Sequence, residues 1–189
     1  MNLKASALTG ISLILLSIVF NSCKTIPEGA SPVSSFEVNK YLGKWYEIAR
    51  MDFKFERNLN NTTAEYSFNE DSTIKVINRG YNYVEEEWDE AIGKAKFSDD
   101  ADIAALKVSF FGPFYAPYNV IALDKEYKYA LVAGKNLDYL WILSREKTIP
   151  DQIKEKYLNK AKEIGYNIDE LVWVEHDLKK VSNTAESME

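Results

Sequence analysis

The side chains that most often carry catalysis are scarce in this sequence. Its 189 residues include one cysteine, Cys23, and one histidine, His176, which stand near opposite ends of the chain. A lone histidine builds neither a zinc site nor a catalytic triad. Glycine-rich phosphate loops, Cys-x-x-Cys pairs and Gly-x-Ser-x-Gly are missing from the sequence as well. We therefore expect no enzyme and no cofactor, and we expect His176 at the surface or at the end of a strand.

An acidic run in the middle of the chain is the strongest candidate for a metal site. Glu85, Glu86 and Glu87 are followed by Asp89 and Glu90. Calcium loops space their oxygen ligands apart, whereas contiguous carboxylates are typical of a solvated turn. We expect a turn here and no bound metal.

Cys23 follows a segment typical of a secretory leader. Lys4 supplies a positive charge, and residues 5–20 carry no charge at all. This stretch is too short and too polar for a spanning helix, which needs about 20 apolar residues. Residues 20–23 (FNSC) resemble the lipobox of bacterial lipoproteins, in which the cysteine receives a diacylglyceryl group. The resemblance implies a lipoprotein signal peptide over residues 1–22 and a lipid on Cys23.

An acylated Cys23 would attach the protein to a membrane covalently. The formal net charge is −6 and no basic run flanks Cys23, so charge does not draw the chain to anionic lipid or to nucleic acid. Lys24 is not the Asp that often retains lipoproteins in the inner membrane, which favours the outer membrane. Residues 23–35, rich in small residues, predict a lipidated tether. The alternative is an ordinary secretory cleavage site beside a buried thiol.

Period-two alternation dominates the rest of the chain and predicts an all-β fold. Eight runs are separated by polar or glycine-containing turns, at residues 43–51, 61–68, 74–80, 88–97, 106–111, 118–123, 129–134 and 139–144. Turn residues between consecutive runs indicate hairpins, and hence an eight-stranded antiparallel up-and-down barrel. A six-stranded sandwich with a solid core fits the same pattern.

One amphipathic helix follows the strands. Apolar residues recur at helical spacing from Ile149 to Ile164, with Pro150 at the start and Gly165 as the stop. The apolar stripe must pack on something, most simply the outer wall of the barrel. Residues 171–174 predict a short last strand, residues 36–178 one domain, and residues 179–189 a polar tail.

Three segments in order carry a resemblance to the lipocalin family. Residues 41–50 (YLGKWYEIAR) contain its Gly-x-Trp motif, residues 118–124 (YNVIALD) resemble its second segment, and residues 143–145 (LSR) its third. With residues 55–57 (FER) and 66–68 (YSF) they resemble the bacterial lipocalins related to apolipoprotein D, over most of the predicted domain. A lipocalin barrel is a closed cup with an open mouth.

The resemblance implies structural roles at the closed end. Gly43 would let the backbone turn into the first strand, Trp45 would plug the barrel, and Arg145 would lie on the indole face. The alternative is that Trp45 is an ordinary core residue and Arg145 an ordinary surface charge. Relatives staple the loop after the first strand with disulfides, and residues 58–61 lack cysteine, so we expect that loop to move more freely.

Alternation then predicts which side chains line the cup, once Trp45 is taken as inward. Most of the predicted wall is small or aromatic, which leaves room for an acyl chain, although the same residues could simply pack a solid interior. The predicted inward positions are Ala64, Tyr66, Val76, Asn78, Ala91, Gly93, Leu106, Val108, Phe110, Tyr118, Val120, Ala122, Val132, Tyr139 and Trp141. All of these except Gly93 and Ala122 are predicted to bind ligand. We expect Asn78 and the tyrosine hydroxyls to bind a carboxylate or phosphate head near the mouth, assisted by Arg50 or Arg79 at the rim.

The family resemblance implies a binding protein of the cell envelope. It would store or carry a small apolar ligand, such as a fatty acid or lysophospholipid, for membrane upkeep. An enzyme on the same barrel, using Tyr66 or Glu47, is the second hypothesis, and an interaction scaffold without ligand is the third. Association of two copies is left open.

Overall fold

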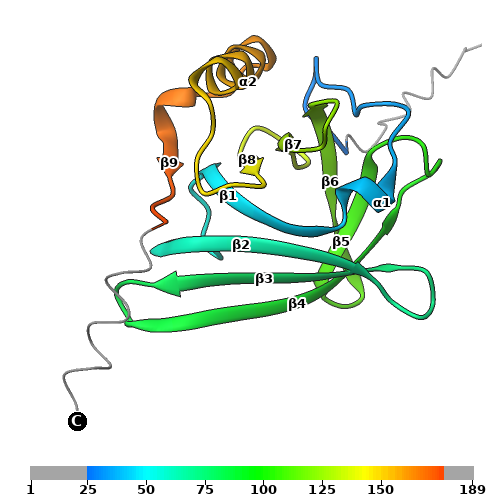
Figure 1. Ribbon diagram of the computed structural model, residues 1–189, viewed down its shortest axis with the longest axis horizontal. Coiled ribbons are helices and arrows are strands. Elements are labelled where there is room, and N and C mark those ends of the chain that lie inside the picture. Colours follow the sequence, from blue (N-terminus) through cyan, green and yellow to red (C-terminus); the bar gives the residue numbers. More distant parts are fainter. Residues whose placement is uncertain (1–24, 177–189) are drawn as a thin grey trace, which may run out of the picture.

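Every strand in the computed structural model, which describes residues 25–176, pairs antiparallel with its neighbour (Figure 1). The predicted leader, Cys23 and the 179–189 tail lie outside the described residues. The elements are α1 (Val38–Tyr41), β1 (Gly43–Met51), β2 (Leu59–Phe68), β3 (Ile74–Asn82), β4 (Glu87–Phe97), β5 (Ala105–Phe111), β6 (Phe114–Leu123), β7 (Tyr129–Ala133), β8 (Leu140–Ser144), α2 (Asp151–Ile164), the 3-10 turn η1 (Ile168–Glu170) and β9 (Leu171–Trp173).

Strand β1 closes the barrel because it has partners on both sides. The sheet runs β2-β3-β4-β5-β6-β7-β8-β1-β9, and β1 also pairs with β2. Residues 43–46 of β1 lie opposite β2, and residues 49–51 lie opposite β9, so the two strands share one side of β1. The predicted eight-stranded up-and-down barrel is confirmed, and the six-stranded sandwich is excluded.

The observed strand boundaries differ most from the predicted ones at Pro117, which interrupts the alternation of side chains. Strand β6 begins at Phe114 rather than at residue 118, and it continues through Pro117, which lies opposite Lys107. Proline removes a ladder hydrogen bond, and the predicted run at residues 118–123 stops short of it. The short helix α1, which the alternation did not predict, covers the end of the barrel where β1 begins.

Helix α2 packs on the outer wall as predicted (Figure 1). Tyr157 and Ala161 are buried against a layer that includes Ile121, Leu131 and Ile142. The Tyr157 hydroxyl donates to the carbonyl oxygen of Tyr129 at 2.8 Å. The helix ends at Gly165, whose φ of 109° is the left-handed conformation that suits glycine.

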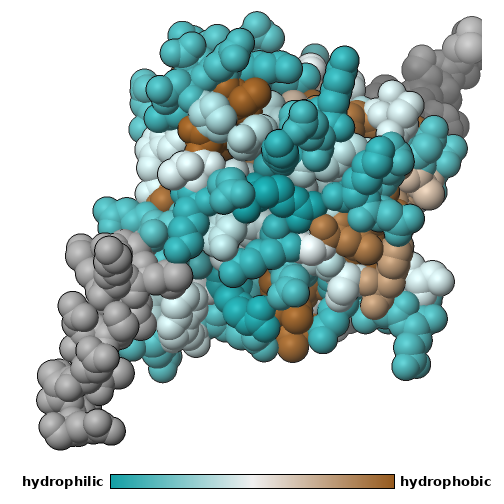
Figure 2. All heavy atoms as spheres, in the orientation of Figure 1, coloured by the Kyte–Doolittle hydropathy of each residue, from teal (hydrophilic) through white to brown (hydrophobic). Residues whose placement is uncertain are grey.

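Apolar residues form two layers, one inside the barrel and one between the wall and α2. The surface seen in Figure 2 is mostly hydrophilic, as expected when apolar side chains lie in these layers. Strict alternation fails at bulges in β1 and β6. Ile121 and Ala122 of β6 both face the outer layer, so the prediction that Ala122 lines the cup is wrong.

Residues 25–35 lie along the barrel and do not hang free. Val33 exchanges backbone hydrogen bonds of 2.9 Å with Val120 and Ala104, and Ile26 packs in the outer layer. The Asn119 side chain also donates to the carbonyl oxygen of Thr25 at 3.0 Å. The prediction of a free tether is therefore wrong for residues 25–35. Their apolar side chains and backbone groups make enough contacts to hold the segment against the barrel.

Candidate ligand-binding site

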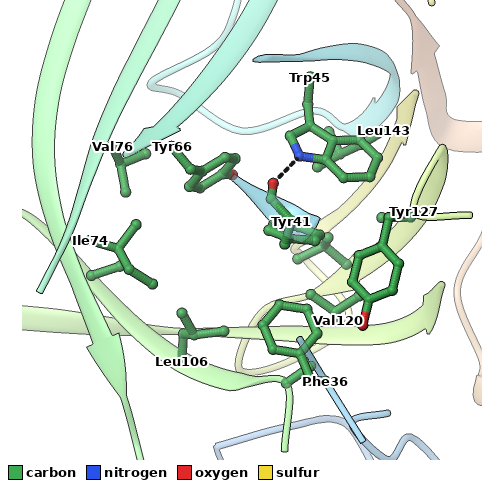
Figure 3. Packing of buried hydrophobic residues seen from close by; sticks show 14 residues of the cluster. Phe36, Tyr41, Trp45, Tyr66, Ile74, Val76, Leu106, Val120, Tyr127 and Leu143 are labelled. Atoms are coloured by element: carbon green, nitrogen blue, oxygen red, sulfur yellow. Dashed lines mark hydrogen bonds between the residues drawn. The ribbon is translucent and has the colours of Figure 1, made fainter. Parts of the chain in front are cut away.

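The closed end of the barrel is built around a fully buried tryptophan. The guanidinium carbon of Arg145 lies 3.8 Å from the centroid of the Trp45 ring, which confirms the predicted stacking. The Trp45 indole N–H donates to the carbonyl oxygen of Tyr41 at 2.8 Å (Figure 3). Trp45 therefore joins the wall to the end of α1.

Arg145 does more than cover the ring. Its Nη2 donates to the carbonyl oxygens of Lys40, Tyr41 and Leu42 at 2.9, 3.0 and 2.9 Å. These carbonyls end α1, where a cation satisfies the oxygens that the helix leaves unpaired. Gly43 follows with a φ of 90°, a conformation that suits glycine and turns the chain into β1 as predicted.

Three tyrosine hydroxyls meet directly above this floor. The Tyr118 hydroxyl lies 2.7 Å from that of Tyr41 and 2.9 Å from that of Tyr66. Burial raises the pKa of all three, which keeps the phenols neutral. The Tyr66 and Tyr118 hydroxyls lie at the closed end and bond to each other, so the predicted position near the mouth is wrong.

Most of the predicted wall faces the interior. Figure 3 shows such side chains pointing toward one another across the barrel, among them Tyr66, Val76, Leu106 and Val120. The interior layer or its margin contains Ala64, Tyr66, Val76, Leu106, Val108, Phe110, Tyr118, Val120, Val132 and Trp141. Asn78 and Ala91 lie opposite each other on the face that Val76 shares, and Tyr139 stacks on Trp141 with ring centroids 6.3 Å apart.

Exposure of these inward side chains varies along the barrel. Val76, Leu106 and Val132 are buried, whereas Asn78 is partly exposed and Ala91 is exposed. Solvent therefore reaches the inner face at Asn78 and Ala91, whereas Glu47 and Arg50, which also face inward, are buried. The lumen is the part of the interior that these four side chains border.

Gly93 does not widen this lumen. A Cβ at Gly93 would lie 2.8 Å from the ring of Phe110 and 2.8 Å from the carbonyl oxygen of Ser109. The space that the missing side chain leaves is therefore filled by Phe110. The expectation that Gly93 adds volume is wrong, because a neighbouring ring uses the room.

Charged groups occupy the lumen above the tyrosines. Arg50 is 1% exposed, and its Nη1 donates to Glu47 Oε1 at 2.8 Å. The Trp141 indole N–H donates to Glu56 Oε2 at 3.0 Å, and that oxygen lies 4.0 Å from Arg50 Nε. Arg79 instead pairs with Glu90 and Glu65 on the exposed outer wall, so of the two arginines predicted to assist, only Arg50 faces the lumen.

The two carboxyl groups have altered acidity. Burial, followed by the charge of nearby Glu47, raises the pKa of Glu56 to about 8. Burial also raises the pKa of Glu47, in spite of the ion pair with Arg50. The lumen therefore tolerates the Glu47–Arg50 pair and disfavours a second negative charge.

The loop between β1 and β2 reaches into the mouth. Phe53 packs edge-on against Tyr139 and Trp141, with centroids 5.5 and 5.6 Å apart. Arg50 Nη2 donates to the carbonyl oxygens of Glu56 and Leu59 at 2.5 and 3.1 Å. These contacts tie the loop down from within, where the resemblance led us to expect a freer loop for want of cysteines.

The inward position of Glu56 was missed by sequence reasoning. Alternation covers strands and says nothing about a loop, and the only signal was the FER motif at residues 55–57. That motif indicates a family but gives Glu56 no partner.

The comparison with known families agrees with this geometry. A lipocalin-like domain model matches residues 36–176. The chain is a lipocalin. It is 53% identical over 157 residues to the outer membrane lipoprotein Blc of Citrobacter freundii, with 83% of this chain and 89% of the relative covered. The Blc of Vibrio cholerae is 50% identical over 166 residues, with 87% and 97% covered.

These relatives identify a bacterial lipocalin that is a lipid-anchored protein of the outer membrane. Rat apolipoprotein D is 38% identical over 132 residues, with 62% of this chain and 65% of the relative covered. Insecticyanin from the tobacco hornworm, a solved structure, has a TM-score of 0.67 at 19% identity, with 79% of this lipocalin and 86% of that chain covered. The last likeness shows the fold alone.

The other two candidate sites from the sequence are the acidic run at Glu85–Glu87 and the histidine His176. Glu85, Glu86 and Glu87 are exposed at the β3–β4 turn, and within residues 25–176 no group of His, Cys, Asp and Glu is placed to hold a metal ion. His176 is half-buried just after β9, with Nε2 2.7 Å from the carbonyl oxygen of Glu47. In the described part of the chain, no helix is long and apolar enough to cross a membrane.

Proposed function

We propose that this lipocalin binds fatty acids or lysophospholipids inside its barrel and stores or carries them at the outer membrane, where a lipid on Cys23 anchors it. The observation that carries the proposal is the difference along the inner wall. Val76, Leu106 and Val132 are apolar and buried, whereas Asn78 is partly exposed and Ala91 is exposed. A closed apolar end and an open polar end suit an amphiphile that enters chain first.

The acyl chain occupies the space between the two sides of the wall. Ala64, Val76 and Val108 flank it, and Ala91 and Asn78 border it nearer the mouth. The tyrosine cluster around Tyr118 sets the depth limit, because its three hydroxyls bond to one another across the closed end of the barrel. The head group lies at the level of Trp141 and Tyr139.

Binding accounts for the interior carboxyl groups better than catalysis does. Glu47 is paired with Arg50, and Glu56 accepts from Trp141, so both have structural partners. The second hypothesis, an enzyme that uses Tyr66 or Glu47, requires turnover of a lipid that a Tyr66 or Glu47 substitution abolishes while binding persists. Incubation of purified protein with candidate lipids, followed by mass spectrometry of the products, tests it.

A pair of tryptophan substitutions tests the lumen directly. Ala91→Trp places a bulky ring on the inner face of β4, whereas Ile92→Trp places the same ring on the outer face, where Ile92 is already 54% exposed. We expect Ala91→Trp to abolish binding of a fluorescent fatty acid. Ile92→Trp should bind the same fatty acid with the affinity of the parent protein. Equal binding by the two variants would contradict a ligand in the barrel. A barrel that ignores fatty acid and lysophospholipid and yields no lipid on native mass spectrometry would favour a scaffold.

The anchor needs a separate test because Cys23 lies outside the described residues. Cells fed labelled palmitate should yield labelled protein in the membrane fraction, and Cys23→Ala should remove both the label and the membrane association. An unlabelled parent protein would favour the ordinary secretory cleavage site.

A further inference from the structure

Arg50 has an unused hydrogen-bond donor inside the barrel. Its Nη1 and Nη2 are engaged by Glu47, Glu56 and Leu59, but its buried Nε has no partner within hydrogen-bond distance. The nearest acceptor is Glu56 Oε2 at 4.0 Å, the same oxygen that accepts from Trp141 Nε1. Buried donors are almost always satisfied, so an unpaired one beside a lumen points to a missing acceptor.

We infer that the space between Arg50 Nε and Trp141 Nε1, now held by the Glu56 carboxyl, is a head-group subsite that takes the uncharged carbonyl of an acyl ester or a protonated fatty acid. A carbonyl oxygen has two lone pairs, so it can accept from both donors at once. The inference deepens the proposed function and rests on it.

Charge balance explains why the preferred head is neutral. Glu47 lies 2.8 Å from Arg50, and the two side chains retain 7% and 2% of their exposure, so the arginine's charge is already matched in place. A second anion beside this pair would lie where the Glu56 carboxyl lies. That carboxyl is itself neutral at neutral pH, because its pKa is raised to about 8. A phosphate is therefore expected to stay outside, at the mouth.

Glu56 can leave the subsite without unfolding the loop. Arg50 Nη2 holds the backbone carbonyls of Glu56 and Leu59, and Phe53 remains packed on Trp141. The Glu56 side chain is 15% exposed to solvent, so it can turn outward into water. Rotation of one side chain thus exchanges the resident carboxyl for a ligand carbonyl.

Two ligands that differ only in the carbonyl provide the test. The purified full-length chain is titrated with 1-monopalmitoylglycerol and with 1-O-hexadecylglycerol, its ether analogue. We expect the ester to bind about tenfold more tightly, the effect of one to two hydrogen bonds. Hexadecyl phosphate should bind more weakly than the ester.

Three variants assign the preference to the subsite. Trp141→Phe should bring the ester-to-ether ratio close to one while ether binding persists, which also shows that the variant folds. Trp88→Phe, on the outer wall with Trp88 48% exposed, should keep the parent ratio. Glu56→Ala should strengthen ester binding, because it removes the competing carboxyl.

The outcomes separate the subsite from the proposed function. Equal affinity for ester and ether, a ratio that survives Trp141→Phe, or tighter binding of hexadecyl phosphate would each overturn the subsite and leave a lipid-binding barrel in place. Failure of the parent protein to bind either glycerolipid or palmitic acid would overturn the proposed function itself.

Discussion

Replacement of Glu56 by glutamine should change how the stability of the protein depends on pH. Glutamine resembles the protonated carboxyl and keeps an oxygen that accepts from Trp141. The pKa of Glu56 is raised from 4.5 to about 8 in the folded protein. The folded state therefore holds a proton that the unfolded chain releases, so the parent protein loses stability as the pH rises from about 4.5 through about 8. Glu56→Gln has no proton to lose at this position.

The size of the effect follows from the two pKa values. At about 1.36 kcal/mol per pH unit, the difference between 4.5 and about 8 amounts to roughly 5 kcal/mol. This is an upper bound because the Glu56 side chain keeps 15% of its exposure, and we expect about half of it. Glu47 also has a raised pKa and makes stability depend on pH. Because Glu47 is present in both the parent and Glu56→Gln, this dependence largely cancels when the two free energies of unfolding are compared.

Urea unfolding followed by tryptophan fluorescence between pH 5 and pH 9 measures the effect. We expect similar free energies of unfolding for Glu56→Gln and the parent near pH 5, and a gap of about 2–3 kcal/mol in favour of the variant near pH 9. Glu90→Gln on the exposed outer wall should run parallel to the parent. If Glu56→Gln also stayed within about 0.5 kcal/mol of the parent across this range, Glu56 would not be a buried neutral acid.

Three further substitutions test the packing by urea unfolding. Arg145→Lys should lower the free energy of unfolding by about 2–4 kcal/mol, since an ammonium cannot stack on Trp45 and reach the same carbonyl oxygens. Gly93→Ala should cost about 1–3 kcal/mol, because the new methyl lies 2.8 Å from the Phe110 ring. Tyr118→Phe should cost about 1–3 kcal/mol, since it removes the hydroxyl that two other tyrosines share. A variant as stable as the parent would contradict the contact concerned.

The wall of the barrel could be predicted because a strand turns alternate side chains to alternate faces. Once Trp45 is inward, positions such as Ala64, Val76 and Val108 follow by counting. The counting fails at Ala122, where an extra residue in β6 opposite β7 shifts the register. A bulge depends on how two strands pair, and one strand's pattern does not contain that information.

The mouth was harder to predict than the floor. The Trp45–Arg145 pair belongs to motifs with a known arrangement, so the resemblance supplied a contact across 100 positions of the chain. The link between Glu56 and Trp141 spans 85 positions of the chain and has no such guide. Glutamate in a polar loop is ordinarily a solvated residue, and only its long-range partners place it in the lumen.

The double pairing of β1 has a consequence for how the chain acquires its fold. β1 is among the first elements to be synthesised, yet its partners β8 and β9 end at Ser144 and Trp173. A nascent chain that emerges from its N-terminus therefore cannot close the barrel until almost all of it is free, and until then β1 keeps an open edge.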